Sequence, residues 1–215
     1  MRRESDTGIV RNYCQNHKGG VFDLNFLSKH VFKDIPNVNL RKIVTRFIEQ
    51  GILRQVSKGV YLIGESNIAD EDRIINHYID KGYGLPIGKY LLYTLGLVDE
   101  EPIEKIIKAN HTIGTRNICN IKVIQSNSSF FERVGAKKII TALEILSASN
   151  EIDNDKLFKA TELLEELLSG YYDNAMTCYV TDEYPRNVYL RLADILDSMQ
   201  ISHKVIENCV SKQQV

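Results

Sequence analysis

Apolar residues in the first part of the chain recur at intervals of three and four residues, a spacing that is typical of amphipathic helices. The spacing predicts a first helix over residues 5–16, which ends before the Gly19-Gly20 pair. A short extended segment at Val21-Phe22 follows, and Asp23 is then placed to cap a second helix over residues 24–31. Two short helices separated by an extended segment are therefore expected at the start of the chain.

The pattern after Pro36 predicts a third helix with two very different sides. This helix is expected over residues 38–50, with Asn37 as its N-cap and Gly51 ending it at the C′ position. Its apolar stripe should face the core and consists of Leu40, Ile43, Val44, Phe47 and Ile48. The opposite side carries polar residues, namely Asn39, Lys42, Arg46 and Glu49, with Arg41 and Thr45 beside them.

After Gly51 the pattern changes to short runs that are typical of strands. Two strands are expected, over residues 52–56 and 60–63, joined by a Ser57-Lys58-Gly59 turn in which the glycine supplies the positive φ of a tight turn. Three helices followed by a hairpin with a basic tip is the element order of a winged helix-turn-helix. Residues 1–64 are therefore expected to form a domain of this kind.

The chain after residue 64 is expected to form a second, larger domain of mixed helices and strands, over residues 65–215. Residues 64–70 are interpreted as a linker, and strands are expected at 103–109 and 118–125, around a turn-rich segment. The helices expected here span residues 70–81, 86–95, 136–147, 153–168 and 185–199, and residues 171–181 stay ambiguous. The fold class predicted for the whole chain is α+β.

The net charge of −1 conceals two regions of opposite charge. Residues 1–64 contain eleven Lys and Arg against five Asp and Glu, a net charge of +6, whereas residues 65–215 contain sixteen against twenty-three, a net charge of −7. A basic domain suits a polyanion, because each neutralised phosphate releases condensed counterions. The first domain is therefore the one that we expect to bind a nucleic acid.

Several broad classes of protein are not expected from the composition. No run approaches the roughly 20 apolar residues of a membrane span, and the polar start of the chain has no apolar segment of a secretory signal behind it. A cytoplasmic location is therefore expected. The cysteines are widely spaced, with no CxxC pair, and favour reduced thiols over a disulfide framework or a zinc site: Cys14, Cys119, Cys178 and Cys209.

The third helix carries the candidate chemistry, because a helix fits the major groove of duplex DNA and its polar residues can reach base edges. Asn39 could pair with adenine, and Lys42 and Arg46 could reach guanine or a phosphate. Arg41 and Thr45 beside them could contact the DNA backbone. The hairpin could add a phosphate or minor-groove contact from Lys58 and a backbone contact from Arg54. The alternative is that these residues are only the solvated side of an amphipathic helix.

The sequence offers little support for an enzyme. The five histidines include no pair spaced for a metal, and His111 in the turn-rich segment is interpreted as a surface residue. Acidic clusters such as Asp70-Glu71-Asp72 are more typical of helix starts than of a nuclease centre. Nucleophile-elbow, phosphate-loop and dinucleotide motifs are all missing from the sequence. We therefore expect a protein without enzymatic activity, cofactor or metal.

Two segments resemble a known family. Residues 40–61 are similar to the signature "aLsRLvkrGeirrlgrGlYy" of the AbiE-type (AbiEi-like) abortive-infection antitoxins and transcriptional regulators. Residues 84–98 are similar to the family's later stretch, a glycine-containing turn followed by a helix and "LGL", here Leu95-Gly96-Leu97. The resemblance extends from about residue 22 to about residue 125.

The resemblance implies a DNA-binding autorepressor and an antitoxin of a type IV toxin–antitoxin system that acts in phage defence. In that family, the winged helix binds inverted repeats in its own promoter and the second domain counteracts a nucleotidyltransferase-like toxin. The DNA-reading positions would then be Asn39, Arg41, Lys42, Thr45 and Arg46, with Lys58 in the wing. A dimer would suit an inverted repeat, but two monomers could occupy one equally well.

Two other classes of function stay open at this point. The acidic second domain could be an interaction module that sequesters a basic partner, with the winged helix as a docking fold. The dense tyrosines after residue 170 would suit such an interface if they were exposed, although core tyrosines fit equally well. A nuclease that acts on invading DNA is the third possibility, and no carboxylate in the sequence is singled out for it.

Overall fold

The computed structural model describes residues 5–80, 84–110, 112–126, 135–171 and 184–212 of the 215-residue chain. Its first part contains three helices and a small antiparallel sheet. The helices are α1 (Asp6–Asn16), α2 (Leu24–His30) and α3 (Asn37–Glu49), and the strands are β1 (Val21–Asp23), β2 (Leu53–Ser57) and β3 (Val60–Ile63). The strands are ordered β1-β3-β2, so β3 pairs with both of the others.

The structure confirms the expected helix ends at Asp23 and Gly51, adds a cap at Ser5 that was not predicted, and differs from the prediction at Asn37. Ser5 accepts the Gly8 N–H at the start of α1, and Asp23 accepts the N–H groups of Asn25 and Phe26 at the start of α2. Gly51, at φ 69°, ends α3 in the left-handed conformation. The prediction of Asn37 as an N-cap is wrong by one residue, because the chain is already helical at Asn37 and its cap is Pro36, which has no side-chain donor or acceptor.

The second part of the chain contributes a four-stranded mixed sheet and helix α4 (Asp70–Ile79), which packs on it. The strands are ordered β4-β5-β7-β6, with β5 and β7 parallel and the outer pairs antiparallel. Their bounds, with that of the short helix α5, are β4 (Gly84–Pro86), α5 (Gly88–Thr94), β5 (Lys105–Ala109), β6 (Arg116–Ile118) and β7 (Ile121–Gln125).

Two predictions for this sheet are wrong. Pro86 was expected in the first turn of a helix, but it lies at the end of β4, an edge strand of the sheet. An edge strand tolerates proline because the missing N–H interrupts no hydrogen bonds between central strands. The single strand expected over 118–125 is a hairpin, which turns at Cys119 and Asn120. Cys119 adopts a φ of 55°. A positive φ usually indicates glycine, and the sequence has none at this turn, so the turn was not predicted.

Helices make up most of the remaining described chain, in close agreement with the expected segments. They are α6 (Ala136–Ser147), α7 (Leu157–Leu168), α9 (Arg186–Ser198) and α10 (Lys204–Lys212), with short 3₁₀ turns at Ser149–Glu151 and Asn154–Lys156. Helix α10 was not predicted. Tyr171, Tyr184 and Tyr189 are buried, which favours their interpretation as core residues, whereas Tyr172 and Tyr179 lie outside the described residues.

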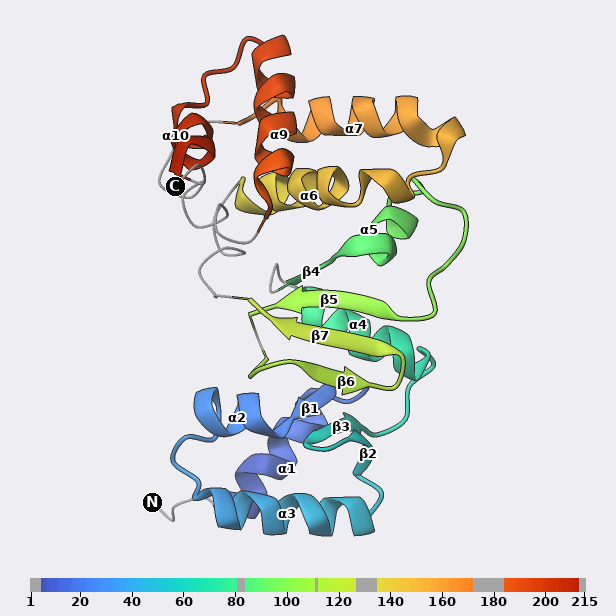
Figure 1. Ribbon diagram of the computed structural model, residues 1–215. Coiled ribbons are helices and arrows are strands. Elements are labelled where there is room, and N and C mark those ends of the chain that lie inside the picture. The colour runs from blue at the N-terminus through green and yellow to red at the C-terminus, as the bar shows by residue number, and fades with distance from the viewer. Residues whose placement is uncertain (1–4, 81–83, 111, 127–134, 172–183, 213–215) are drawn as a thin grey trace.

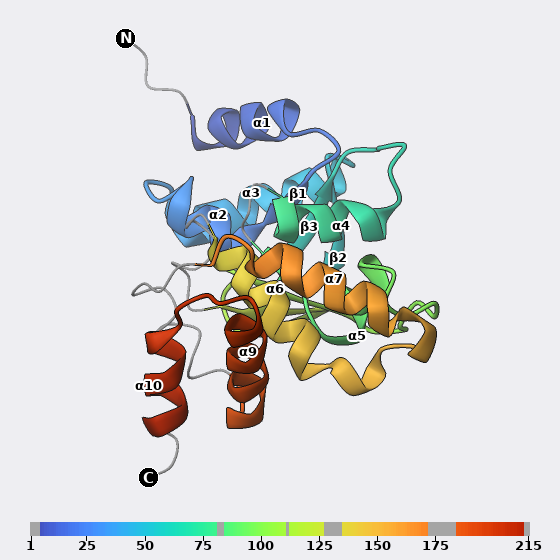
Figure 2. The same cartoon turned by 90° about the horizontal axis from the view of Figure 1, so that it is seen from above.

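The elements form three tiers along the molecule (Figure 1). Helix α3 lies at one end, the four-stranded sheet lies in the middle, and α6, α7, α9 and α10 lie at the other end. Viewed from that end, α6 and α7 run next to each other, and α1 and α10 lie on opposite sides of the molecule (Figure 2). The chain is therefore a mixed α+β protein, as the pattern predicted. Among the described residues, no helix is both long enough and apolar enough to cross a membrane.

The expected boundary at residues 64 and 65 falls between β3 and α4, but an apolar cluster crosses it. Val21, Val60 and Leu62 from the first sheet pack with Ile74 and Tyr78 of α4 and with residues of the second sheet. A separate cluster lies within the first region, around Phe22 of β1 and Leu40 and Phe47 of α3. The first region is thus attached to the second by buried side chains as well as by the chain itself.

Candidate nucleic-acid interface

The outer side of α3 holds the five residues that the sequence singled out on this helix. Asn39, Arg41, Lys42, Thr45 and Arg46 are all exposed. The opposite side holds the core residues Leu40, Ile43, Val44 and Phe47, each at most 3% exposed. Because α3 lies at one end of the molecule, no other helix or strand covers its outer side (Figure 1).

The basic groups on this surface form no ion pair within the part of the chain that the structure describes. Among the described residues, no carboxylate lies within 4 Å of the charged groups of Arg41, Lys42 or Arg46. The hydroxyl of Thr45 donates to the carbonyl of Arg41, 3.1 Å away, so its oxygen can still accept. Three uncompensated cations on one helix create a positive surface that can attract phosphate groups.

Arg54 has a partner within the protein. Its guanidinium pairs with the carboxylate of Asp70 at the start of α4, and this hydrogen bond is the main cause that lowers the pKa of Asp70. Both side chains remain substantially exposed, at 60% and 46%, and pairs of this kind contribute little to stability. The expected contact between Arg54 and a DNA backbone stays a prediction, and it would compete with this ion pair.

Lys58 is exposed, but the hairpin turn that carries it is fastened on both sides. The hydroxyl of Ser57 donates to the carbonyl of Asn117 in β6, 3.2 Å away. The carbonyl of Gly59 accepts the N–H of Leu24, at 2.9 Å. The tip of the expected wing is therefore docked against the second region and the start of α2, and a contact from Lys58 to DNA stays a prediction.

Asp23 is a fully buried carboxylate at the junction of the two regions, with 0% exposure. One oxygen caps α2, and the other accepts the hydroxyl of Tyr78 at 3.1 Å and pairs with the guanidinium of Arg116 at 3.0 Å. Burial, with the nearby negative charge of Asp23, raises the pKa of Tyr78, which keeps its hydroxyl protonated as a donor. The sequence indicated only the cap, because the other partners lie far along the chain.

Arg73 of α4 forms a second buried connection across the junction. Its guanidinium donates to the carbonyls of Gly19 at 2.8 Å, Ile63 at 3.0 Å and Gly64 at 3.1 Å. These carbonyls belong to the turn before β1 and to the end of β3. The segment interpreted as a linker is therefore held at its start by an arginine that no local sequence signal reveals.

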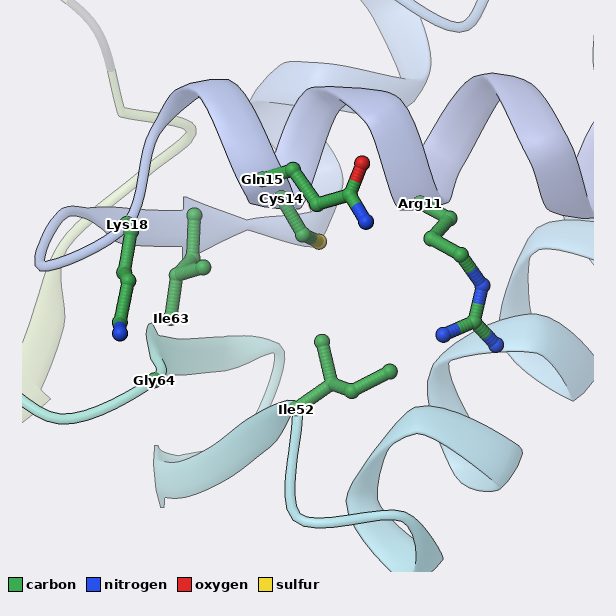
Figure 3. Close-up of a pocket in the computed structure, with 7 residues that line it drawn as sticks. All are labelled: Arg11, Cys14, Gln15, Lys18, Ile52, Ile63 and Gly64. Carbon is green, nitrogen blue, oxygen red and sulfur yellow. The ribbon is translucent and has the colours of Figure 1, made fainter.

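A small pocket of about 200 Å³ lies between α1 and the base of the hairpin. The side chains of Cys14 and Ile52 point into it, Ile63 lies on the side of Lys18, and Arg11 lies on the opposite side (Figure 3). Arg11 already donates to the Gln50 amide oxygen at 2.9 Å and covers the Phe47 ring. Burial raises the pKa of the Cys14 thiol to about 11, so the group stays a neutral thiol near neutral pH and is poorly suited to act as a nucleophile.

No group of three or more His, Cys, Asp and Glu is placed to hold a metal ion within the described part of the chain. The acidic start of α4 instead forms ion pairs, since Glu71 binds Lys105 of β5 and Asp70 binds Arg54 and Arg73. These pairs account for two of the carboxylates in the Asp70-Glu71-Asp72 cluster. His111 lies outside the described residues.

Comparisons with known proteins add a distant structural likeness. No protein-family model matches the chain, and no curated protein matches it. Among solved structures, the chain is similar to the crystal structure of the RV2827C protein from Mycobacterium tuberculosis. The two are 15% identical, with a TM-score of 0.38, and the match covers 99% of this chain and 83% of the other. A likeness of this degree assigns neither a family nor an activity to the chain.

The structure thus places the expected residues in two sets. The five residues of α3 lie together on one open surface, whereas Arg54 and Lys58 belong to a hairpin that is bound to α4 and β6. Sequence reasoning missed the residues that fasten the two regions, notably Arg73 and Arg116. Their partners are backbone carbonyls and a distant carboxylate, neither of which leaves a local motif.

Proposed function

We propose that the first region is a winged helix-turn-helix that binds duplex DNA, with α3 as its recognition helix. The observation that carries this proposal is the outer side of α3, at one end of the molecule. Three cations that have no acidic partner among the described residues lie there beside Asn39 and Thr45. The element order of three helices and an antiparallel hairpin supports the same interpretation.

The width of α3 fits the major groove of duplex DNA. An α-helix with its side chains is about 10–12 Å across, and the major groove of B-DNA is about 12 Å wide. Lys42 and Arg46 lie one helical turn apart, so they would reach neighbouring base pairs, and the amide of Asn39 can bond an adenine edge in two places. Sequence preference would come from these three side chains, and general affinity from the net positive charge of residues 1–64.

We propose further that the chain is an autorepressor and the antitoxin of a type IV toxin–antitoxin system. This part rests on the resemblance of residues 40–61 and 84–98 to AbiE-type antitoxins. Repression would act by steric occlusion of the promoter. The second region would counteract a nucleotidyltransferase-like toxin, and growth rescue on co-expression with such a protein encoded beside this gene tests that role. Failure to restore growth would disprove the antitoxin role without affecting the DNA-binding proposal.

Replacement of two cations on α3 tests the DNA-binding proposal. We expect Lys42→Ala with Arg46→Ala to weaken binding to the chain's own promoter, measured by fluorescence anisotropy. Each lost base contact should cost about 1–3 kcal/mol, or roughly 5-fold to 150-fold in affinity. The matched control replaces Lys138 and Lys204 with alanine, two exposed lysines of α6 and α10 that change the net charge equally. Equal affinities of the two double variants would disprove the role of α3.

A specific feature of α7 favours a second candidate function, the binding of a basic protein. Phe158 is 76% exposed, and Glu162, Glu165 and Glu166 on the same helix are exposed, with no ion pair among the described residues. A partner with a basic surface would suit this helix. Glu162→Lys with Glu166→Lys should abolish capture of such a partner by the full chain and leave DNA binding intact. Unchanged capture would exclude α7 as the contact surface.

A further inference from the structure

A polar pocket of about 250 Å³ lies where α2, α3 and a turn of the second region meet. Helix α2 supplies Asn25, Ser28 and Lys29, and α3 supplies Asn37 and Arg41. The second region supplies Ile113, which lies in the turn before β6. The pocket therefore borders the outer side of α3 but is not formed by the first region alone.

The chemistry of this pocket suits a monoanion held by cations and amides. Lys29 and Arg41 bring two positive charges, and no carboxylate lies within 4 Å of either group among the described residues. The side-chain amides of Asn25 and Asn37 have no hydrogen-bond partner in the part of the chain that the structure describes, so they can donate to a ligand oxygen. Cations and N–H donors around one hollow are the usual setting of phosphate contacts.

The turn that carries Ile113 is held in a fixed place. The N–H of Gly114 donates to the side-chain oxygen of Gln125 in β7, at 2.7 Å. Two residues further on, Arg116 pairs with the buried carboxylate of Asp23, at the start of α2. The turn is therefore fastened both to its own sheet and to the first region, so its position beside α2 and α3 is part of the fold.

We infer that this pocket binds a backbone phosphate of the DNA duplex and that the turn around Ile113 is part of the DNA-binding surface. The inference rests on the proposed function. Arg41 directly precedes Lys42 on α3 and therefore lies beside it on the helix surface. If Lys42 and Arg46 contact the bases of a duplex, the sugar-phosphate backbone of that duplex passes along the side of α3 that Arg41 occupies. Ile113, 39% exposed, would then contact a deoxyribose. The second region thus contributes to DNA binding directly.

Two single variants with matched controls test this contact by anisotropy on the full chain. Lys29→Ala removes a cation, and its control is Lys33→Ala, an exposed lysine between α2 and α3 that does not line the pocket. Ile113→Glu places a carboxylate in the pocket, and its control is Ile103→Glu at a site that is 91% exposed and outside the pocket. The probes are the chain's own promoter fragment and a random-sequence duplex of the same length, each titrated from about 50 to 200 mM salt.

Both pocket variants should bind the two duplexes about fivefold to tenfold more weakly than their controls, because a phosphate contact is independent of sequence. Lys29→Ala should also reduce the slope of log affinity against log salt by about one. If the pocket variants bind the duplexes as tightly as their controls while the Lys42 and Arg46 double variant still loses affinity, the phosphate contact in the pocket is disproved and the proposed function stands. A wild-type chain that binds neither duplex would overturn both.

Discussion

At the scale of single residues, Asp23 shows how much more a side chain can do than its local sequence indicates. The expected N-cap of α2 is confirmed, because Asp23 accepts two backbone N–H groups. The same carboxylate also binds Tyr78 and Arg116, which lie 55 and 93 residues away along the chain. A cap is visible in a sequence because its partners are adjacent, whereas a buried ion pair depends on a fold that must be known first.

Loss of the Asp23 carboxylate should destabilise the whole chain. We expect Asp23→Ala to lower the free energy of unfolding by about 3–5 kcal/mol, because it leaves the largely buried guanidinium of Arg116 without its counter-charge and removes the cap of α2. Urea denaturation followed by circular dichroism measures this loss. Asp34→Ala, at an exposed carboxylate with no partner among the described residues, should stay within about 0.5 kcal/mol of the wild type. Equal midpoints for the two variants would contradict the structural role of Asp23.

At the scale of elements, helices and the first hairpin follow from sequence pattern much better than the second sheet does. Helix α6 matches its predicted range at both ends, since its apolar spacing is long and regular. The second sheet contains three-residue strands, and β6 and β7 were merged because Ile118 and Ile121 continue an apolar run across the turn. Short strands carry too few residues for a periodic signal, and their pairing with distant strands decides their bounds.

Gly84 illustrates an element that depends on close backbone approach. A Cβ at this position would lie 2.7 Å from the carbonyl oxygen of Lys108 in β5 and even closer to that of Tyr78 in α4. We therefore expect Gly84→Ala to destabilise the chain by about 2–3 kcal/mol, because two backbone segments would have to move. Thermal or urea unfolding measures the effect.

The matched control for that substitution is Gly170→Ala. A Cβ at Gly170 meets no atom of the described residues within 4 Å, and its backbone is outside the left-handed region, so alanine should be tolerated or slightly stabilising. Equal denaturation midpoints for Gly84→Ala and this control would disprove the close packing of β4 between α4 and β5. The sequence could not single out Gly84, because nothing local distinguishes it from the other glycines.

At the scale of the whole molecule, charge and shape are arranged along one axis. The basic α3 and the acidic α7 lie at opposite ends (Figure 1), and residues 1–64 and 65–215 carry net charges of +6 and −7. The electric field of a polyanion would orient such a molecule with α3 towards it. The composition alone predicted the asymmetry, but only the fold places the two charged helices at opposite ends.

The two regions should nevertheless unfold together, and Arg73 is the residue that tests this. We expect Arg73→Met to destabilise the chain by about 2–4 kcal/mol, because the carbonyls of Gly19, Ile63 and Gly64 lose their shared charged donor at a buried junction. Hydrogen exchange read by mass spectrometry should then show faster exchange in α3 and in β5 alike, since one apolar cluster joins the first sheet to the second. Lys33→Met, which removes an exposed cation, should leave both protected. If faster exchange is confined to α4 and the adjoining β3, α3 and the second region are energetically independent, and the expectation that the two regions unfold together is wrong.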